Sequence, residues 1–382
     1  MANLASHHRS SPLAGSPERR RRTPLRSPAT APASSSRRAA GTMAGVDGTG
    51  WQPVETDEED VVSGRALGAL YDLLDDGNPA PFPGASVPIL WHWLAFLPRA
   101  AQHELGPDGH PRRGGFLPPV DLPRRMIAGG KVLLHAGLAA GQPLRRRAKV
   151  ASVEEKRGRS GRFVLVTVRY EIEPALTGGP GLPDGPALPG RPALPGGAAL
   201  PEDASPRAAP LLVEEQHIAY REAHDRVLQA AANPAPAGGA RAAPEDGPGS
   251  SRWSLSWDLA IEPALLFRFS ALTYNAHRIH YDRAWATGVE GYPGLVVHGP
   301  LQAVALAELC RRHVPERTVQ LFEFRATSPK FDDGPLLLRG APEARAGTER
   351  AGGATGPDAV ELVAFDGRGT VTMRARAVWA AG

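Results

Sequence analysis

Four polar side chains follow a strand-like apolar run in the last third of this 382-residue chain. They lie within eight residues of one another: Asn275, His277, His280 and Asp282. A histidine titrates near neutral pH and is the side chain most often used as a general acid or base. Polar groups at the end of an apolar segment are either satisfied by partners or functional. His280 is therefore the first candidate for proton transfer.

A second candidate is Gly299, which follows His298 and precedes Pro300. Proline suits the first position of a helix, and the apolar residues that follow predict a helix over 300–313. The start of a helix presents unpaired N–H groups and the positive end of the helix dipole. Because Pro300 has no N–H, Gly299 is the natural donor to a carbonyl oxygen that becomes an enolate. A flexible glycine before a helix is the structural alternative.

The elements that must position these residues follow from periodicity. In the C-terminal half, strands are predicted at 253–260, 319–327, 335–339, 360–365 and 371–379, with Asp366-Gly367 in the last turn. In the N-terminal half, helices are predicted at 65–76 and 86–97, and strands at 131–138, 163–172 and 211–221. Each half thus reads as helical material followed by several antiparallel strands.

Composition divides the chain into four parts. The composition of residues 1–42 predicts a disordered basic tail. The same residues could also precede the true start of translation, with Met43 as the initiator, and a transit peptide is the alternative. Residues 43–231 form the N-terminal half, with a flexible Pro/Gly/Ala-rich insert at 174–210. Residues 232–251 read as a linker, and residues 252–382 form the C-terminal half that carries the polar cluster.

Charge and cysteine content exclude some functions. The chain has a net charge of +4, but residues 1–42 hold eight arginines and one acid and so account for +7. The remaining residues therefore carry a net charge of −3. This mildly acidic remainder gives little support to nucleic-acid binding. Cys310 is the single cysteine, which excludes an intrachain disulfide and a cysteine-based metal site and suits a packing residue. The sequence holds no apolar run long enough to span a membrane. The cytoplasm is the expected location, with mitochondria left open by the Arg/Ser-rich N-terminus.

The segment from Tyr274 to Ala286, with Val297-His298-Gly299 downstream, resembles the MaoC-like, R-specific enoyl-thioester hydratases. Their pattern is Gly-Asp-x-Asn-Pro-x-His followed by a His-Gly that opens the central helix. The variant found here is similar to one branch of that family. This branch contains type-2 3-hydroxyacyl-thioester dehydratases and the two-hotdog mesaconyl-C4-CoA (3-methylfumaryl-CoA) and itaconyl-CoA hydratases. The resemblance implies an α+β double hotdog, in which two antiparallel sheets each wrap around a central helix.

The resemblance also implies the chemistry, which is addition or removal of water across the double bond of an α,β-unsaturated acyl-CoA. By position, His280 matches the catalytic histidine and Gly299 the oxyanion glycine. Asn275 stands where the family has its catalytic aspartate, and an amide can only orient water or substrate. The second acid–base function is left to His277 or to Asp282, and His277 is preferred because the family counterpart of Asp282 is not catalytic. The N-terminal half lacks this cluster and is expected to be non-catalytic.

The remaining expectations concern ligands. His277, Arg278 and His298 are assigned to substrate binding, with Arg278 a candidate partner for a substrate carboxylate. Arg124, Arg125 and Arg145–Arg147 could hold coenzyme A phosphates, but a solvated face is favoured. The expected partner is an acyl-CoA, with no metal, no further cofactor, no nucleic acid and no membrane, and a homodimer is one possible assembly. The alternatives are a dehydratase of fatty-acid synthesis, a hotdog thioesterase and a non-catalytic thioester-binding protein.

Overall fold

The computed structural model describes residues 50–76, 83–158, 161–175, 208–222, 247–343 and 358–380. The chain divides into two units, residues 1–39 and 40–382, and every described residue belongs to the second. The predicted tail 1–42 lies outside the described residues, as do most of the insert 174–210 and most of the linker 232–251. The predictions made for those segments stay predictions.

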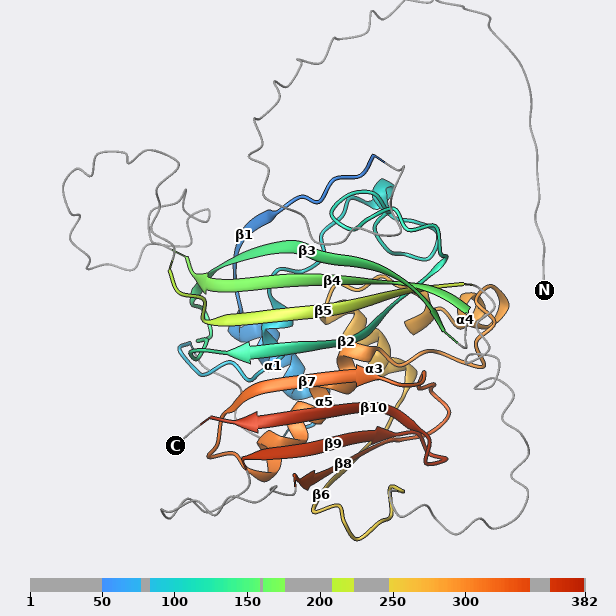
Figure 1. Cartoon of the computed structure of the whole chain (residues 1–382). Helices are drawn as coiled ribbons and strands as arrows, with labels where there is room; N and C mark the ends of the chain where they lie inside the picture. The colour runs from blue at the N-terminus through green and yellow to red at the C-terminus, as the bar shows by residue number, and fades with distance from the viewer. Residues whose placement is uncertain are drawn as a thin grey trace, which may run out of the picture. The chain divides into compact units, whose positions relative to one another are not determined.

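Within the described part of the chain, ten strands form one antiparallel sheet in the order β1-β3-β4-β5-β2-β7-β10-β9-β8-β6 (Figure 1). The first five belong to the N-terminal half and the last five to the C-terminal half. Their bounds are β1 Thr56–Val61, β2 Arg124–Leu134, β3 Pro143–Gly158, β4 Gly161–Pro174, β5 Leu212–Arg221, β6 Leu255–Leu259, β7 Val319–Ala326, β8 Leu336–Pro342, β9 Ala359–Phe365 and β10 Val371–Trp379.

The two halves join where β2 pairs with β7. Two consecutive glycines of β2 make this close pairing feasible. A Cβ on Gly129 would lie 2.5 Å from the carbonyl oxygen of Phe324, and one on Gly130 would lie 2.8 Å from the Phe324 ring. The register of β2 against β5 also shifts between Ile127 and Gly129, as at a β-bulge. Gly129 and Gly130 therefore allow the two halves to join in one continuous sheet.

The helix α5 (Gly299–His313) is the core of the C-terminal half, and the sheet lies in front of it in Figure 1. Residues Leu301 to Cys310 are all buried, and α5 contacts β2 and each of the strands β6 to β10. A helix buried on every side is what its apolar sequence predicts. The predicted helix 300–313 is thus confirmed, with Cys310 inside the core.

Two predictions about the apolar segments are wrong. The residues before the polar cluster are not a strand but the helix α3 (Pro263–Leu272), which starts with proline at its first turn. The segment 86–97 is not a long helix but a 3-10 turn, Trp91–Leu94, flanked by Leu90 and Phe96 at positive φ. Buried hydrogen bonds from His92 and Trp93 to Glu214 of β5 hold this turn in place, and such tertiary contacts outweigh local helix propensity. The predicted helix 65–76 is present as α1 (Gly64–Leu73).

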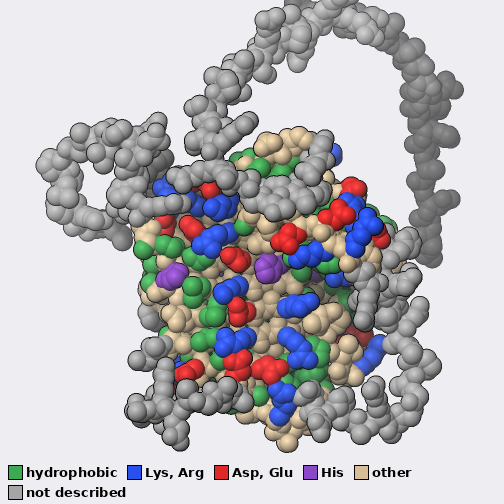
Figure 2. All heavy atoms as spheres, in the orientation of Figure 1, with side chains coloured by type: hydrophobic (Ala, Val, Ile, Leu, Met, Phe, Trp, Pro, Cys, Tyr) green, Lys and Arg blue, Asp and Glu red, His purple; other side chains and the backbone are tan. Residues whose placement is uncertain are grey.

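Two strands escaped prediction because they are charged. The arginines of β3 face acids of neighbouring strands, with Arg145 paired to Asp57, Arg146 to Glu58 and Arg147 to Glu173. Their guanidinium groups are thus engaged within the sheet, which agrees with the favoured alternative to phosphate binding. Figure 2 shows basic and acidic side chains interspersed over this outward face of the sheet. Among the described residues, no helix is long and apolar enough to cross a membrane.

Candidate active site

The polar cluster begins where α3 ends. Tyr274 adopts φ +50°, the left-handed conformation that glycine takes freely and other residues adopt at a cost of about 1–2 kcal/mol. This turn lets the amide of Asn275 donate to the carbonyl of Ser270 at 2.8 Å. The side-chain oxygen of Asn275 in turn accepts from the amide of His277 at 3.0 Å. Asn275 is therefore part of the turn that aims the following histidines.

His280 ends the short 3-10 turn η3 (Arg278–His280) and is buried. Its Nδ1 lies 2.7 Å from the carbonyl oxygen of Val296. A carbonyl only accepts, so Nδ1 carries the proton and Nε2 keeps a free lone pair. Burial lowers the pKa of His280 to about 4, against the opposing effect of the Val296 hydrogen bond. The side chain is thus a neutral imidazole, fixed in the tautomer that a general base needs.

His298 lies directly behind His280. The two rings stack with centroids 3.6 Å apart, and His298 is fully buried with its Nε2 2.8 Å from the Ser270 hydroxyl. Burial first, and then the charges on His280 and His277, hold the pKa of His298 well below its usual value. These contacts favour a supporting role behind His280 over direct contact with a substrate.

Gly299 follows this stacked histidine and is the first residue of α5, so its N–H has no partner within the helix. A Cβ at Gly299 would lie 3.8 Å from Ile127 of β2, which is ordinary van der Waals contact. Packing therefore does not require a glycine here. What glycine provides is an amide at the positive end of a fifteen-residue helix, with no side chain of its own beside it.

Arg278 and Asp282 stabilise the turn around the histidines. Arg278 donates to Asp282 at 2.7 Å and to the carbonyl of Pro107 at 3.2 Å, and its guanidinium lies 4.0 Å from the centre of the Trp285 ring. Asp282 also caps the helix α4 (Arg283–Gly288) by accepting from the Trp285 amide. Because these groups are engaged, Arg278 is better suited to positioning than to holding a substrate carboxylate.

Sequence reasoning missed a loop of the N-terminal half that closes on the cluster. An isolated bridge pairs Leu105 with Pro111, and between them the chain turns at Gly109, with φ +89°. A Cβ at Gly109 would lie 1.8 Å from the carbonyl oxygen of Ala276, so the loop and the cluster are in direct backbone contact. The amide of Arg278 also donates to the carbonyl of Asp108 at 2.9 Å.

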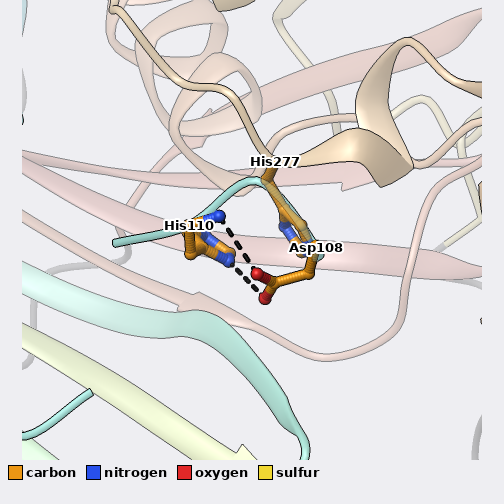
Figure 3. Close-up of side chains that lie close together, drawn as sticks. All are labelled: Asp108, His110 and His277. Carbon is orange, nitrogen blue, oxygen red and sulfur yellow. Dashed lines mark hydrogen bonds and ion pairs between the residues drawn. The ribbon is translucent and has the colours of Figure 1, made fainter. Parts of the chain in front are cut away.

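This loop brings Asp108 and His110 to the histidine cluster, as Figure 3 shows. Nδ1 of His110 lies 3.0 Å from the Asp108 carboxylate, and the His110 ring lies 3.9 Å from that of His277. His277 then meets His280 edge-on, with ring centroids 5.3 Å apart. A pocket of about 270 Å³ opens at the same junction, lined by Gly109 and Ala276 among others.

The electrostatics of this group favour an ionised carboxylate beside neutral rings. Burial alone would raise the pKa of Asp108, but its two hydrogen bonds from His110 outweigh burial and lower it. Burial lowers the pKa of His110, and its hydrogen bond to Asp108 opposes that effect. Burial also strongly lowers the pKa of His277, next to the charges on His110 and His280. One ligand-type atom from each of Asp108, His110 and His277 lies within 4.8 Å of the others, so a metal ion must also be considered.

Comparison with known proteins shows the family of the chain. The model of the family "Hydroxyacyl-thioester dehydratase type 2" matches residues 90–177 and 200–332. The chain belongs to this family. It is also 39% identical over 301 residues to the mesaconyl-C(4)-CoA hydratase of Chloroflexus aurantiacus, covering 78% of this chain and 91% of that protein. A shorter match of 85 residues, 42% identical, is to the mitochondrial hydroxyacyl-thioester dehydratase type 2 of Schizosaccharomyces pombe, covering 22% of this chain and 28% of that protein.

Solved structures support the fold. A MaoC-like dehydratase from Phytophthora capsici has a TM-score of 0.52 at 14% identity, covering 86% of this chain and 96% of its own. HtdX of Mycobacterium tuberculosis has a TM-score of 0.50 at 13% identity, and the superposition covers 86% of this chain and 100% of that one. The expected double hotdog is confirmed, and the two sheets are continuous through β2 and β7. With relatives named as hydratase and dehydratase, the enzyme is a hydro-lyase.

Proposed function

We propose that this hydro-lyase adds water reversibly across the double bond of a short α,β-unsaturated acyl-CoA that ends in a free carboxylate, such as mesaconyl-C4-CoA. The observation that carries the proposal is the fixed tautomer of His280. Its Nδ1 is held by the Val296 carbonyl, so Nε2 is free to accept a proton. The ring of His298 stacks on this base, and the next residue, Gly299, supplies the first amide of α5.

In the hydration direction, Nε2 of His280 takes a proton from water as the water oxygen bonds to the β-carbon. The electron pair of the double bond moves to the thioester oxygen and forms an enolate. The Gly299 N–H at the start of α5 stabilises that oxygen, where a helix dipole and an unpaired donor act together. Protonation of the α-carbon then completes the addition, and each step reverses in dehydration.

Asn275 and His277 flank this chemistry. Asn275 cannot exchange protons at neutral pH, and its oxygen already accepts from the His277 amide. It therefore orients the turn. His277 is buried between His110 and His280 and carries a strongly lowered pKa, which suits a neutral hydrogen-bonding contact with the substrate.

The free carboxylate of such a substrate needs a cation, and Arg125 is the better candidate than Arg278. Arg125 is paired in register with the buried Tyr220 across β2 and β5, so the two side chains share the inward face of the sheet. Ile127, two residues along β2, reaches Gly299. Arg125 is also close enough for its charge to lower the pKa of His110 and of His277. Among the described residues it has no ion-pair partner.

A 3-hydroxyacyl-thioester dehydratase uses the same residues in the opposite direction, and the match to the Schizosaccharomyces pombe protein supports this second reading over about a fifth of the chain. A thioesterase would need a carboxylate close to the thioester carbon. The position expected for it is Asn275, which does not favour hydrolysis.

The test follows two signals in one reaction. The purified chain is incubated with crotonyl-CoA and with mesaconyl-C4-CoA, and enoyl absorbance and free thiol are recorded together. Loss of absorbance without thiol release is expected for both, with the higher kcat/KM for mesaconyl-C4-CoA. Thiol release without hydration would overturn the assignment in favour of hydrolysis, and tight binding without turnover would favour a binding protein.

A further inference from the structure

The N-terminal half contributes side chains to the candidate active site. Asp108 and His110 lie on the loop whose backbone contacts Ala276 and Arg278 directly. That contact places a carboxylate–imidazole pair against His277, which in turn touches His280. The closest approach requires glycine at position 109, because any Cβ there would overlap the Ala276 carbonyl.

His110 and His280 are held in the same way. Nδ1 of His280 donates to the Val296 carbonyl, and Nδ1 of His110 faces the Asp108 carboxylate at 3.0 Å. An ionised carboxylate can only accept, so His110 also carries its proton on Nδ1 and leaves Nε2 free. The backbone amide of His110 donates to the other Asp108 oxygen at 3.1 Å, which fixes the carboxylate in turn. A base oriented by a carboxylate is the arrangement of catalytic dyads and triads.

We propose that His110, oriented by Asp108, is the second acid–base residue of the reaction and exchanges the proton at the α-carbon of the thioester. The proposal rests on the proposed function, which needs such a group, because the amide of Asn275 cannot supply it. His280 handles the proton of water and His110 handles the proton of carbon. The active site is then shared between the two halves.

The protons balance as follows. In hydration, His110 and His280 both start neutral, and His110 first takes a proton from solvent at Nε2 to form an imidazolium paired with Asp108. His280 gains a proton from water as the C–O bond forms, and His110 gives its Nε2 proton to the α-carbon as the enolate collapses to the thioester. The product gains one hydroxyl and one hydrogen. His280 then loses its proton to solvent, which leaves both rings neutral and restores the starting state.

A metal ion is the competing explanation for Asp108, His110 and His277. The geometry opposes it in two respects. With its Nδ1–H donated to Asp108, His110 could ligate a metal only through Nε2, and Asp108 would then stand behind the ring instead of binding the metal. That leaves two imidazoles, with ring centroids 3.9 Å apart and planes tilted by 39°, whereas zinc sites use three or four protein ligands.

The experiment compares His110→Gln and Asp108→Asn with the wild type. His103→Gln is the matched control, because His103 is exposed in the same segment and touches none of these groups. Two reactions are measured: hydration of crotonyl-CoA, and exchange of the α-hydrogens of the saturated thioester butyryl-CoA in D2O. Exchange needs only a base at the α-carbon and the oxyanion donor, so it does not depend on hydration.

Loss of general acid–base catalysis predicts a fall of about 10²- to 10⁴-fold in both reactions for His110→Gln, and a smaller fall in both for Asp108→Asn. His280→Gln should lose hydration but keep exchange, whereas His110→Gln should lose both. A purely structural role for His110 would not produce this difference between the two variants. If His110→Gln does not fold, Asp108→Asn decides, since its amide oxygen can still accept from the His110 backbone.

Hydration within about threefold of wild type in a folded His110→Gln or Asp108→Asn variant would overturn the proposal. So would exchange that survives in His110→Gln, absence of exchange in the wild type, or activity lost to EDTA and restored by Zn²⁺. The proposed function fails separately, if the wild type hydrates neither crotonyl-CoA nor mesaconyl-C4-CoA. Butyryl-CoA exchange would still test His110 in that case.

Discussion

Replacing Gly109 by alanine tests whether the N-terminal loop must dock on the histidine cluster. The added Cβ would lie 1.8 Å from the carbonyl oxygen of Ala276, a backbone atom that cannot rotate away. Real Cβ atoms essentially never come closer than 3.0 Å, so loop and cluster must separate by at least the difference, 1.2 Å. Asp108 and His110 flank this position and would move with it.

The expected loss follows from that displacement. A misplacement of about 1 Å at a catalytic group costs roughly 10²-fold in rate. Alanine at φ +89° adds a backbone strain of about 1–2 kcal/mol, which lowers stability but has no direct effect on the chemistry. Gly109→Ala should therefore fold, with a modest loss of stability, and show kcat for crotonyl-CoA hydration reduced about 10²-fold.

Gly114→Ala separates strain from displacement. Gly114 has φ +93°, and a Cβ there would meet nothing closer than Pro119 at 3.7 Å. Both variants should lose free energy of unfolding from backbone strain in urea denaturation, with the larger loss in Gly109→Ala because its clash also disturbs the loop contact, but only Gly109→Ala should lose activity. Equal activity in the two variants, or a Gly109→Ala enzyme as fast as wild type, would refute the reasoning.

Three further outcomes are expected. Burial lowers the pKa of His280 to about 4, and the base must be neutral to act. The value of kcat/KM for hydration should therefore persist as pH falls below 6.5 and be lost only as pH falls through about 4. An acid limb near 6.5 in the pH profile would contradict this. Arg125→Gln should lower kcat/KM for mesaconyl-C4-CoA by about 10- to 150-fold, which corresponds to the loss of a charged hydrogen bond of about 1.5–3 kcal/mol. The kcat/KM for crotonyl-CoA should not change. Equal losses for both substrates would exclude a role in carboxylate recognition. Asn275→Asp should retain or raise hydration activity, since a carboxylate oxygen can still accept from the His277 amide, and a large loss would show that the amide has its own role.

The parts of the fold that were predictable have simple apolar patterns. The alternating residues of β4 and the continuous apolar run of α5 each match one arrangement of buried surface. β1 and β3 were missed because they are rich in charged residues whose partners lie on neighbouring strands, such as Arg145 with Asp57, and no single segment reveals that pairing. The helix α3 was taken for a strand, because an apolar stretch of ten residues fits either period.

The site shows the same limit. The proximity of His280 to the start of α5 was predictable because the two lie close in sequence and the elements between them are short. Asp108 and His110 lie more than 160 residues before His280, and only the folded chain brings them together. A signal was nevertheless present, since the sequence Gly-Pro-Asp-Gly-His-Pro at 106–111 combines turn residues with two groups able to exchange protons.

The most direct test of the central claim is the rate of mesaconyl-C4-CoA hydration by His280→Gln beside the wild type. Glutamine keeps a polar side chain of similar length but has no group that can take a proton from water. A fall of about 10²- to 10⁴-fold in kcat is expected, with binding of butyryl-CoA, which has no double bond to hydrate, unchanged. Hydration at near wild-type rate in a folded His280→Gln enzyme would contradict the assignment of His280 as the base.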